Sequence, residues 1–265
     1  MSQRSATPVH ITHIGGPTAL IEIGQFRILT DPAFDPAGSQ YVAGPRVVIK
    51  TTSPAIAASA LGKVDVVLLS HDHHIDNLDP AGRAYLPQAR QVLTTPAGAE
   101  RLGDGARGVS TWETVELRGE DGLWVRVTAT PAHHGPEEIL GVIGDVTGWI
   151  VEWDGQEHGA LYISGDTVLF RGLEEVGQRY QIGVALLHFG AAHFDAYGPY
   201  YLTLTGVEGA QLVKTLGEAI IVPIHYEGWR HFTQGRAEIE QAFAEAGLEK
   251  RLRFLPFGEA VAFDI

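Results

Sequence analysis

Four apolar segments of this 265-residue chain end in the same way, with histidine or aspartate following a run typical of a buried strand. Strand ends meet at one edge of a sheet in α/β proteins, so polar side chains far apart in the sequence are expected to converge there. The pattern therefore predicts an α/β fold with its functional site at one sheet edge. The polar positions that follow the four segments are residues 71–76, residues 133–134, Asp166 and His225.

Strand-like and helix-like runs alternate along both halves of the chain. Residues 9–30 contain three short β-rich runs separated by glycines, which is typical of a β-meander. Ser53 as an N-cap predicts a helix over residues 53–62. Thr205 and Glu208 form a T-x-x-E capping box at the start of a later predicted helix. No linker separates the two halves, so the simplest architecture is two packed sheets with helices outside.

Composition narrows the class of protein. The formal net charge of -13 argues against nucleic acid or an anionic membrane as a partner. The chain has no cysteine, which excludes disulfides, a thiolate zinc site and a cysteine nucleophile. No apolar run approaches the roughly 18 residues expected of a membrane span, and the first residues lack the apolar core of a signal peptide. We expect a cytoplasmic protein that acts on a small molecule.

The segment SHDHHIDNLD, residues 70–79, holds three histidines and three aspartates. His71 and His73 are two positions apart, so on an extended segment both side chains point to one side and can reach one ion. Neutral imidazole together with carboxylate suits zinc, iron or manganese. The alternative is a solvated polar loop, but the polar groups at the other strand ends favour a metal site.

The order of these motifs carries a resemblance to a known family. SHDHHIDNLD, TPAHHG, ISGDT and VPIHYEGW follow one another as H-x-H-x-D-H, P-A-x-H, S-G-D-T and a last strand ending in histidine do in metallo-β-lactamase-fold metal-dependent hydrolases. The chain is most similar to the ascorbate-6-phosphate-lactonase-like branch, whose opening strands the segment THIGGPTALIEIG also resembles. The resemblance implies a four-layered αββα sandwich and a single domain over residues 1–265.

The resemblance also implies roles for individual residues. His71 and His73 match the first two histidines of the motif and His134 matches the later one, which implies three ligands for a first metal ion. Asp166 matches an aspartate that bridges two ions, and His225 matches a ligand of the second. Asp76 and Asp166 would act in catalysis, by orienting or positioning a metal-bound hydroxide. The implied ligands of one or two zinc ions are His71, His73, Asp76, His134, Asp166 and His225.

The chain departs from the family motif in the histidine-rich segment. The family has aspartate four residues after the first histidine and another histidine directly after it, whereas here residue 75 is isoleucine and Asp76 comes one place late. Asp76 can fill its role if the loop bulges at Ile75, and Asn77 then replaces a histidine. An amide oxygen suits harder cations, so manganese is the alternative to zinc, especially at the second site. Whether His74 or Asn77 completes that site is left open.

Several other polar residues have two interpretations each. His133 would point away from the site if the segment is extended, so we expect it to lie at the surface or behind the ligands. Asp31 either accepts a hydrogen bond from a ligating histidine or is a simple Asp-Pro turn residue. His188 and His193 either contact substrate or are structural, and His231 is expected to be structural or exposed. Aromatic residues between Tyr197 and Phe232 either line a pocket or pack in the core.

These features favour one function over two rivals. A metal-bound hydroxide would cleave an ester, lactone or phosphodiester bond. The first rival is a di-iron redox protein, but no flavin or iron–sulfur segment is evident in the sequence. The second rival is a catalytically degenerate metal-binding module, which the substitution at Asn77 keeps open.

Overall fold

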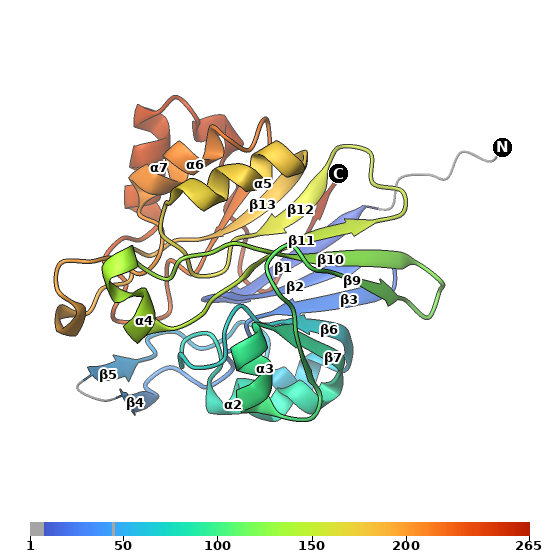
Figure 1. Ribbon diagram of the computed structural model, residues 1–265, viewed down its shortest axis with the longest axis horizontal. Coiled ribbons are helices and arrows are strands. Elements are labelled where there is room, and N and C mark those ends of the chain that lie inside the picture. Colours follow the sequence, from blue (N-terminus) through green and yellow to red (C-terminus); the bar gives the residue numbers. More distant parts are fainter. Residues whose placement is uncertain (1–7, 44–45) are drawn as a thin grey trace.

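The computed structural model describes residues 8–43 and 46–265, which form two large β-sheets packed face to face (Figure 1). The first sheet has the strand order β15 (Ala260–Phe263), β1 (Val9–Gly15), β2 (Thr18–Ile23), β3 (Phe26–Thr30), β6 (Val64–Leu68), β7 (Ala89–Thr94) and β8 (Ala106–Gly108). The second has the order β14 (Ile220–Ile224), β13 (Ile182–His188), β12 (Ala160–Ile163), β11 (Gly148–Trp153), β10 (Trp124–Thr130) and β9 (Thr114–Arg118). A separate hairpin consists of β4 (Gln40–Ala43) and β5 (Arg46–Ile49).

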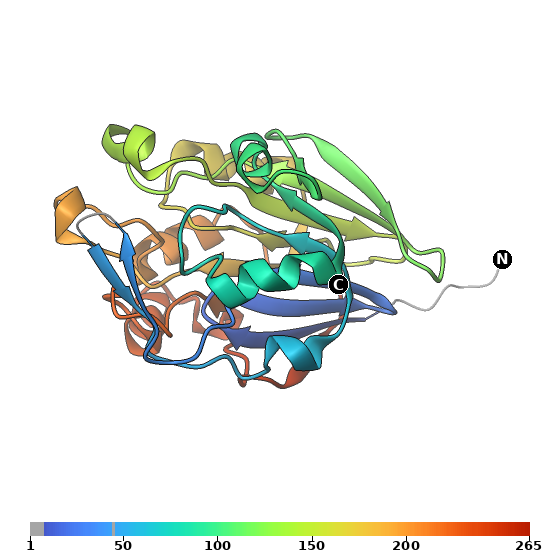
Figure 2. The same cartoon turned by 90° about the horizontal axis from the view of Figure 1, so that it is seen from below.

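Helices cover the outer face of each sheet and complete four layers. On the first sheet these are α1 (Ala58–Leu61), α2 (Pro80–Tyr85) and α3 (Pro96–Leu102), and on the second α5 (Glu174–Arg179), α6 (Gly206–Val213) and α7 (Arg236–Glu245) (Figures 1 and 2). The expected αββα sandwich is confirmed. In the described part of the chain, no helix has the length and apolarity needed to cross a membrane. The remaining helices are α4 (Leu140–Ile143), η1 (Leu86–Gln88), η2 (Glu137–Ile139), η3 (Arg171–Leu173), η4 (Asp195–Tyr197) and η5 (Glu249–Arg251).

Neighbouring residues of the central strands pack into different layers of the core. In β3, Ile28 belongs to the cluster between the sheets, whereas Leu29 belongs to the cluster under the first set of helices. Leu186 and Leu187 of β13 divide in the same way between the inner cluster and the outer one. All four side chains are fully buried, and each contributes about 1.5–3 kcal/mol to folding. This explains why these strands are apolar throughout instead of alternating.

Strand direction brings the polar segments together. β6 is parallel to β3 and β7, and β12, β13 and β14 are parallel to one another. β10 and β12 both pair antiparallel with β11, so β10 runs in the same direction as β12. The residues that follow β10, β12 and β14 consequently lie at one end of the second sheet, and the distances among the ligand atoms place the residues that follow β6 beside them. Figures 1 and 2 place the β4–β5 hairpin, α4 and η4 at this end as well.

The predicted helices differ in how well they match the structure. The capping box before α6 is present, since Thr205 Oγ1 accepts from the Glu208 amide and Glu208 Oε2 accepts from the Thr205 amide. The helix expected over residues 53–62 is wrong in extent, because α1 begins only at Ala58. Ser53 does not cap it, since its Oγ atom accepts a hydrogen bond from the amide of Ala37 at 2.9 Å. This contact with a distant loop takes the place of a local cap.

Candidate metal centre

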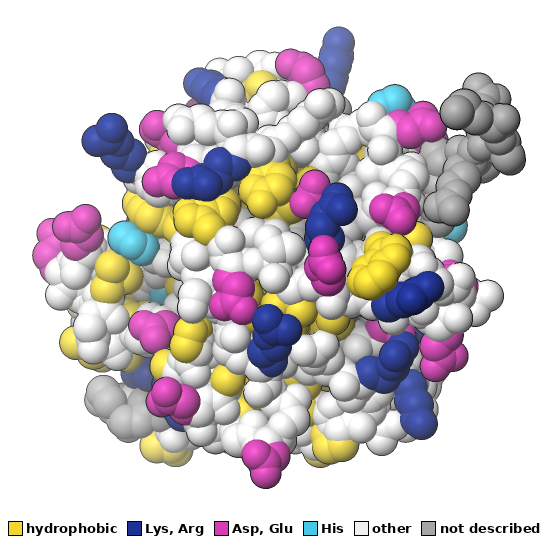
Figure 3. All heavy atoms as spheres, turned by 45° about the vertical axis from the view of Figure 1, so that its right-hand side comes forward, with side chains coloured by type: hydrophobic (Ala, Val, Ile, Leu, Met, Phe, Trp, Pro, Cys, Tyr) yellow, Lys and Arg dark blue, Asp and Glu magenta, His cyan; other side chains and the backbone are white. Residues whose placement is uncertain are grey.

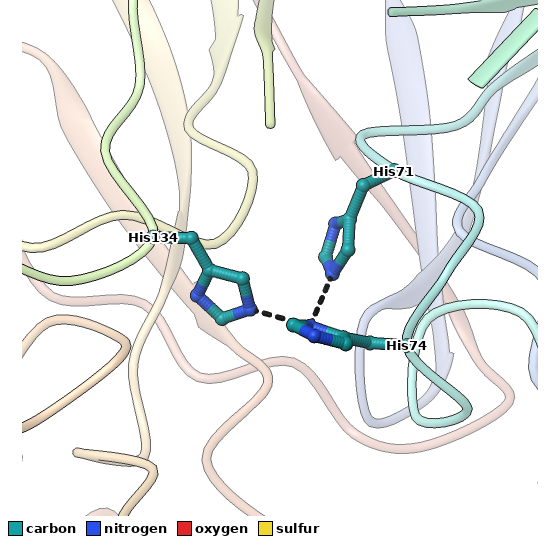
Figure 4. A group of neighbouring side chains, drawn as sticks. All are labelled: His71, His74 and His134. Carbon is teal, nitrogen blue, oxygen red and sulfur yellow. Dashed lines mark hydrogen bonds between the residues drawn. The ribbon is translucent and has the colours of Figure 1, made fainter. Parts of the chain in front are cut away.

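Three histidine rings converge beyond the ends of β6 and β10 (Figure 4). Nδ1 of His74 lies 3.1 Å from Nε2 of His71 and 2.8 Å from Nε2 of His134. Two nitrogen ligands of one tetrahedral zinc ion are about 3.3 Å apart, given zinc–nitrogen bonds of about 2.0–2.1 Å. The three rings therefore have the spacing of a metal-binding group, which we call the histidine group.

Hydrogen bonds on the far side of the rings fix their orientation. His134 Nδ1 donates to the carbonyl oxygen of Leu202 at 2.7 Å, so its Nε2 atom carries the lone pair that faces the group. His71 Nδ1 lies 2.9 Å from Ser70 Oγ, which directs Nε2 of this ring inward in the same way. Such outer hydrogen bonds are a regular feature of metal-binding histidines.

A second group, made of Asp76, Asp166 and His225, adjoins the first and is called the carboxylate group here. His225 Nδ1 lies 3.1 Å from Asp166 Oδ1, and His225 Nε2 lies 3.6 Å from Asp76 Oδ2. The other oxygen of Asp166, Oδ2, lies 3.6 Å from His134 Nε2 and 4.0 Å from His71 Nε2. One carboxylate thus presents one oxygen to each group.

Burying these polar side chains costs free energy unless a cation is bound between them. Neither oxygen of Asp166 accepts a hydrogen bond from the described residues. Burial raises the pKa of Asp166 well above its usual range, and the charges of Asp76 and Asp31 add to this. Burial also lowers the pKa of His134 and of His225 to about 4, which keeps both rings neutral at pH 7. Neutral imidazoles and unpaired buried carboxylate oxygens fit a bound metal cation.

His73 does not belong to either group, contrary to the expectation. Its Nε2 atom lies 2.7 Å from the carbonyl oxygen of Ile143, and its Nδ1 atom faces Asp72 Oδ1 at 3.8 Å. The expectation assumed an extended segment, whereas residues 72–78 form bends and turns, with the amide of Leu78 donating to the carbonyl of His74. In a turn, residues three apart face the same side, so His74 occupies the place expected for His73. If His74 takes the place of the second histidine of the family motif, the extra residue precedes His74 instead of Ile75.

Comparisons with known proteins agree with this geometry. The model of the beta-lactamase superfamily domain matches residues 26–226. The chain belongs to the beta-lactamase superfamily. A protein named UPF0173 metal-dependent hydrolase from Pelotomaculum thermopropionicum is 28% identical over 260 residues, covering 95% of this chain and 98% of that protein. The narrower resemblance to the ascorbate-6-phosphate-lactonase-like branch stays a prediction.

Solved structures share the fold of this superfamily member. An isothiocyanate hydrolase from Delia radicum gut bacteria superposes with a TM-score of 0.81 at 24% identity, covering 97% of this chain and 100% of that one. A protein described as a possible metal-dependent hydrolase from Veillonella parvula gives a TM-score of 0.80 at 20% identity, covering 97% and 99%. At these identities the similarity establishes the fold alone.

Asn77 and His231 adjoin the carboxylate group. Asn77 is fully buried, and neither its amide nitrogen nor its oxygen has a hydrogen-bond partner among the described residues. It lies close enough to Asp166 to offset part of the rise in the pKa of that carboxyl group. His231 Nε2 donates to Asp76 Oδ2 at 2.9 Å, and the His231 ring stacks on Phe194 at 4.7 Å. The sequence analysis missed His231, although it lies six residues after His225.

The remaining candidates belong to neither group. Asp31 Oδ1 accepts from the amide of Ser70 at 2.6 Å, and its Oδ2 atom lies 3.3 Å from His188 Nε2. Asp31 therefore anchors the loop that carries His71 and contacts a histidine outside both groups. His133 stacks on Phe170 at 3.7 Å, and His193 Nδ1 donates to the carbonyl of Tyr200.

Unusual backbone conformations position two of the site residues. His225 has φ +57°, a left-handed conformation that costs energy in a residue other than glycine. Gly165 has φ +61° in the turn before Asp166, and a Cβ atom there would lie 2.4 Å from the carbonyl oxygen of Thr147. Only glycine fits this turn, which directs the Asp166 side chain between the two groups.

A cavity of about 620 Å³ opens over His74 and His134 of the histidine group and over Asp76. Ile75, Leu202 and Val48 supply apolar walls, and its aromatic walls are Tyr41 and Phe194. Two aromatic residues that could have lined the pocket pack in the core instead, since Tyr226 and Trp229 are buried in core clusters. The size and lining suit a small molecule.

Proposed function

We propose that this chain is a hydrolase that uses one or two zinc ions, or manganese at the second site, to cleave an ester, lactone or phosphodiester bond. The observation that supports this most strongly is the position of Asp166, whose two oxygens face the histidine group and the carboxylate group separately. A shared carboxylate between two sets of buried ligands is suited to a pair of metal ions.

The two groups divide the ligands between two ions. His71, His74 and His134 would hold the first ion together with Asp166. Asp76, Asp166 and His225 would hold the second, with the buried amide oxygen of Asn77 available as a further ligand. Because carboxylate and amide oxygens favour harder cations, we infer that manganese competes with zinc at the second site. When bound, the metal supplies a water ionised near neutral pH and a Lewis acid for the scissile bond.

Asp76 supplies an anionic acceptor next to the reacting groups. Burial raises its pKa, but the nearby His225 ring and the hydrogen bond from His231 outweigh burial and lower the pKa well below its usual range. Asp76 therefore stays ionised at neutral pH and can accept a hydrogen bond from the attacking water, which orients it toward the substrate. Hydrogen bonding from His231 to Oδ2 keeps this carboxylate in place.

Metal analysis and a substrate panel test this proposal together. The purified protein is analysed for zinc, manganese and iron, then assayed against ester, lactone and phosphodiester substrates with each metal. We expect bound zinc or manganese and hydrolysis of at least one class, abolished in Asp166→Asn. Bound metal without hydrolysis of any class would support the degenerate module, and bound iron with oxygen consumption would support the redox rival.

A further inference from the structure

We propose that the cavity binds an ester or lactone whose acyl portion is apolar, and that Ile75 is the residue that selects for it. The inference rests on the proposed function and deepens it, because the acyl portion belongs to the molecule whose bond is cleaved at the metal centre.

Ile75 stands between one residue of each ligand group. His74 belongs to the histidine group and Asp76 to the carboxylate group, and all three residues line the cavity. Consecutive Cα atoms are about 3.8 Å apart, so the Ile75 side chain arises directly beside both groups. The loop cannot extend here, because the carbonyl of His74 accepts from the amides of Asn77 and Leu78. The turn therefore places an apolar side chain next to the position where a metal-bound substrate would react.

Ile75 is part of an apolar wall of the cavity. It is half-buried and packs in one cluster with Val48, Tyr41 and Phe194, all of which also line the cavity. Tyr41 and Val48 are directly opposite each other in the β4–β5 hairpin, so their side chains lie on the same face of it. The wall thus combines the loop that carries the metal ligands with one face of the hairpin.

This wall has apolar surface that a ligand can cover. Ile75, Tyr41 and Phe194 are each only half-buried. Covering apolar surface with an apolar group strengthens binding by about fourfold for each methylene group that leaves water. Because the wall begins beside His74 and Asp76, the group it would cover is the one attached to the reacting carbon, which is the acyl portion of an ester or lactone.

The charged side chains of the cavity already have partners in the protein. The charged residues of its described lining are Asp72, Asp76, Arg46, Arg83 and Arg101. Both oxygens of Asp72 lie 3.0 Å from Arg101 Nε, and Arg83 donates to the carbonyl of Asp72. Asp76 accepts from His231, and the guanidinium of Arg46 lies over the ring of Phe194. A charged acyl portion would compete with these contacts, whereas an apolar one covers the wall around Ile75 without displacing them.

The overall charge of the protein also favours an uncharged substrate. The chain has a net charge of -13, and the face in Figure 3 shows acidic side chains spread among basic ones. An acidic protein repels anionic ligands, whereas an uncharged ester or lactone meets no such repulsion. Apolar contact gives such a substrate its affinity without any charge.

Esters with different acyl portions test the inference. The metal-loaded wild type is assayed with the 4-nitrophenyl esters of acetate, butyrate and hydrogen succinate, and each rate is divided by the rate at which hydroxide cleaves the same ester. We expect kcat/KM to rise roughly tenfold from acetate to butyrate, because two further methylene groups are buried. It should fall again for hydrogen succinate, whose carboxylate would lose water against an apolar wall.

Variants of different size show whether Ile75 sets this preference. Ile75→Ala enlarges the cavity and should move the preference from butyrate toward hexanoate, whereas Ile75→Phe narrows it and should move the preference toward acetate. Val207→Ala is the control, because Val207 is an exposed residue of α6 outside the described cavity lining. An equal loss for every ester in both Ile75 variants, at unchanged metal content, would show a structural role and overturn the assignment of Ile75.

Methyl-resonance measurements separate this inference from the proposed function, because they need neither metal nor turnover. In protein labelled at the isoleucine δ1 methyl groups, the Ile75 resonance is the one lost in Ile75→Val. We expect 1-hexanol to shift it at a lower concentration than 1-butanol does, which supports the inference even if no ester is hydrolysed. An Ile75 resonance unmoved by 1-hexanol, or equal normalised kcat/KM for butyrate and hydrogen succinate, would overturn the inference and leave the proposed function standing.

Discussion

His231 Nε2 lies 2.9 Å from Oδ2 of Asp76, although the two residues are 155 positions apart in the chain. The histidine side chain is only 5% exposed, and its ring stacks on Phe194. Its N–H group therefore has a fixed direction and holds Asp76 against His225. Substitution of a residue that orients a metal ligand in this way typically lowers metal affinity or activity by roughly tenfold to hundredfold.

We predict that His231→Phe weakens the second metal site. Loss of the hydrogen bond to Asp76 should reduce affinity at this site by roughly tenfold to hundredfold, with the first site retained. Titration with a competing chelator, followed by metal analysis, measures both sites. His10→Phe is the control, because His10 is an exposed residue of β1. Two retained high-affinity sites in His231→Phe would contradict the role assigned to this residue.

His73 and His74 are adjacent in the chain and provide a matched pair of variants for the first metal site. His74→Ala removes a ring whose Nδ1 lies within 3.1 Å of both other members of the histidine group. We expect it to lose most of the first metal and at least a hundredfold in activity, as removal of a catalytic metal ligand does. His73→Ala should keep the metal, because His73 bonds to the carbonyl of Ile143 instead. Metal content per chain decides between the two, and the reverse pattern would restore the assignment made from the sequence.

Asp79 should be a major determinant of stability. Its Oδ1 accepts from the amides of Phe34 and Gly82, and its Oδ2 accepts from the amide of Asp35 and from Lys50 Nζ at 3.0 Å. Asp79→Ala leaves the Lys50 charge buried, so we expect a loss of about 3–5 kcal/mol in the free energy of unfolding.

Urea denaturation measures this loss. Glu240→Ala removes an exposed ion pair with Arg236 and should change the free energy of unfolding by less than about 1 kcal/mol. A loss in Asp79→Ala as small as in this control would show that the buried network contributes little.

His13 should make stability depend on pH. Its side chain is fully buried, and burial lowers its pKa from 6.5 to about 4. Between pH 6.5 and pH 4 the unfolded chain binds a proton here that the folded chain does not, so stability falls as the pH falls, by about 3 kcal/mol in total. Above pH 6.5 the residue is neutral in both states and contributes no dependence.

Comparison with His13→Gln isolates this contribution. Glutamine keeps a donor for the carbonyl of Gly16, which His13 Nε2 contacts at 2.9 Å, but does not titrate. Urea unfolding of both chelator-treated proteins from pH 7 to pH 4 should show a shallower decline for the variant. Equal declines would mean that His13 titrates alike in both states.

Sequence patterns predict the parts of the site that depend on strand ends. His134, Asp166 and His225 each follow an apolar strand closely, so the fold alone brings them together. His73 and His74 could not be separated in this way, because their directions depend on whether the loop is extended or turned. An extended loop would place the side chains of His71 and His73 on one side. The observed turn places those of His71 and His74 on one side instead.

Contacts between distant segments explain the other differences between the sequence-based expectations and the structure. Ser53 has the sequence signature of a helix cap, yet its hydroxyl group accepts from Ala37 in another loop. His231 has no spacing partner in the sequence, and its role depends on the fold bringing the segment after β14 against Asp76. Local patterns carry no information about such pairs, which form only when the sheets pack.

Anomalous diffraction from crystals grown with zinc tests the central claim most directly. The account predicts a peak within about 2.0–2.2 Å of nitrogens from His71, His74 and His134 and of an Asp166 oxygen. A second peak is expected between Asp166, Asp76 and His225. A peak bonded to His73 in place of His74, or no peak among these residues at saturating zinc, would contradict it.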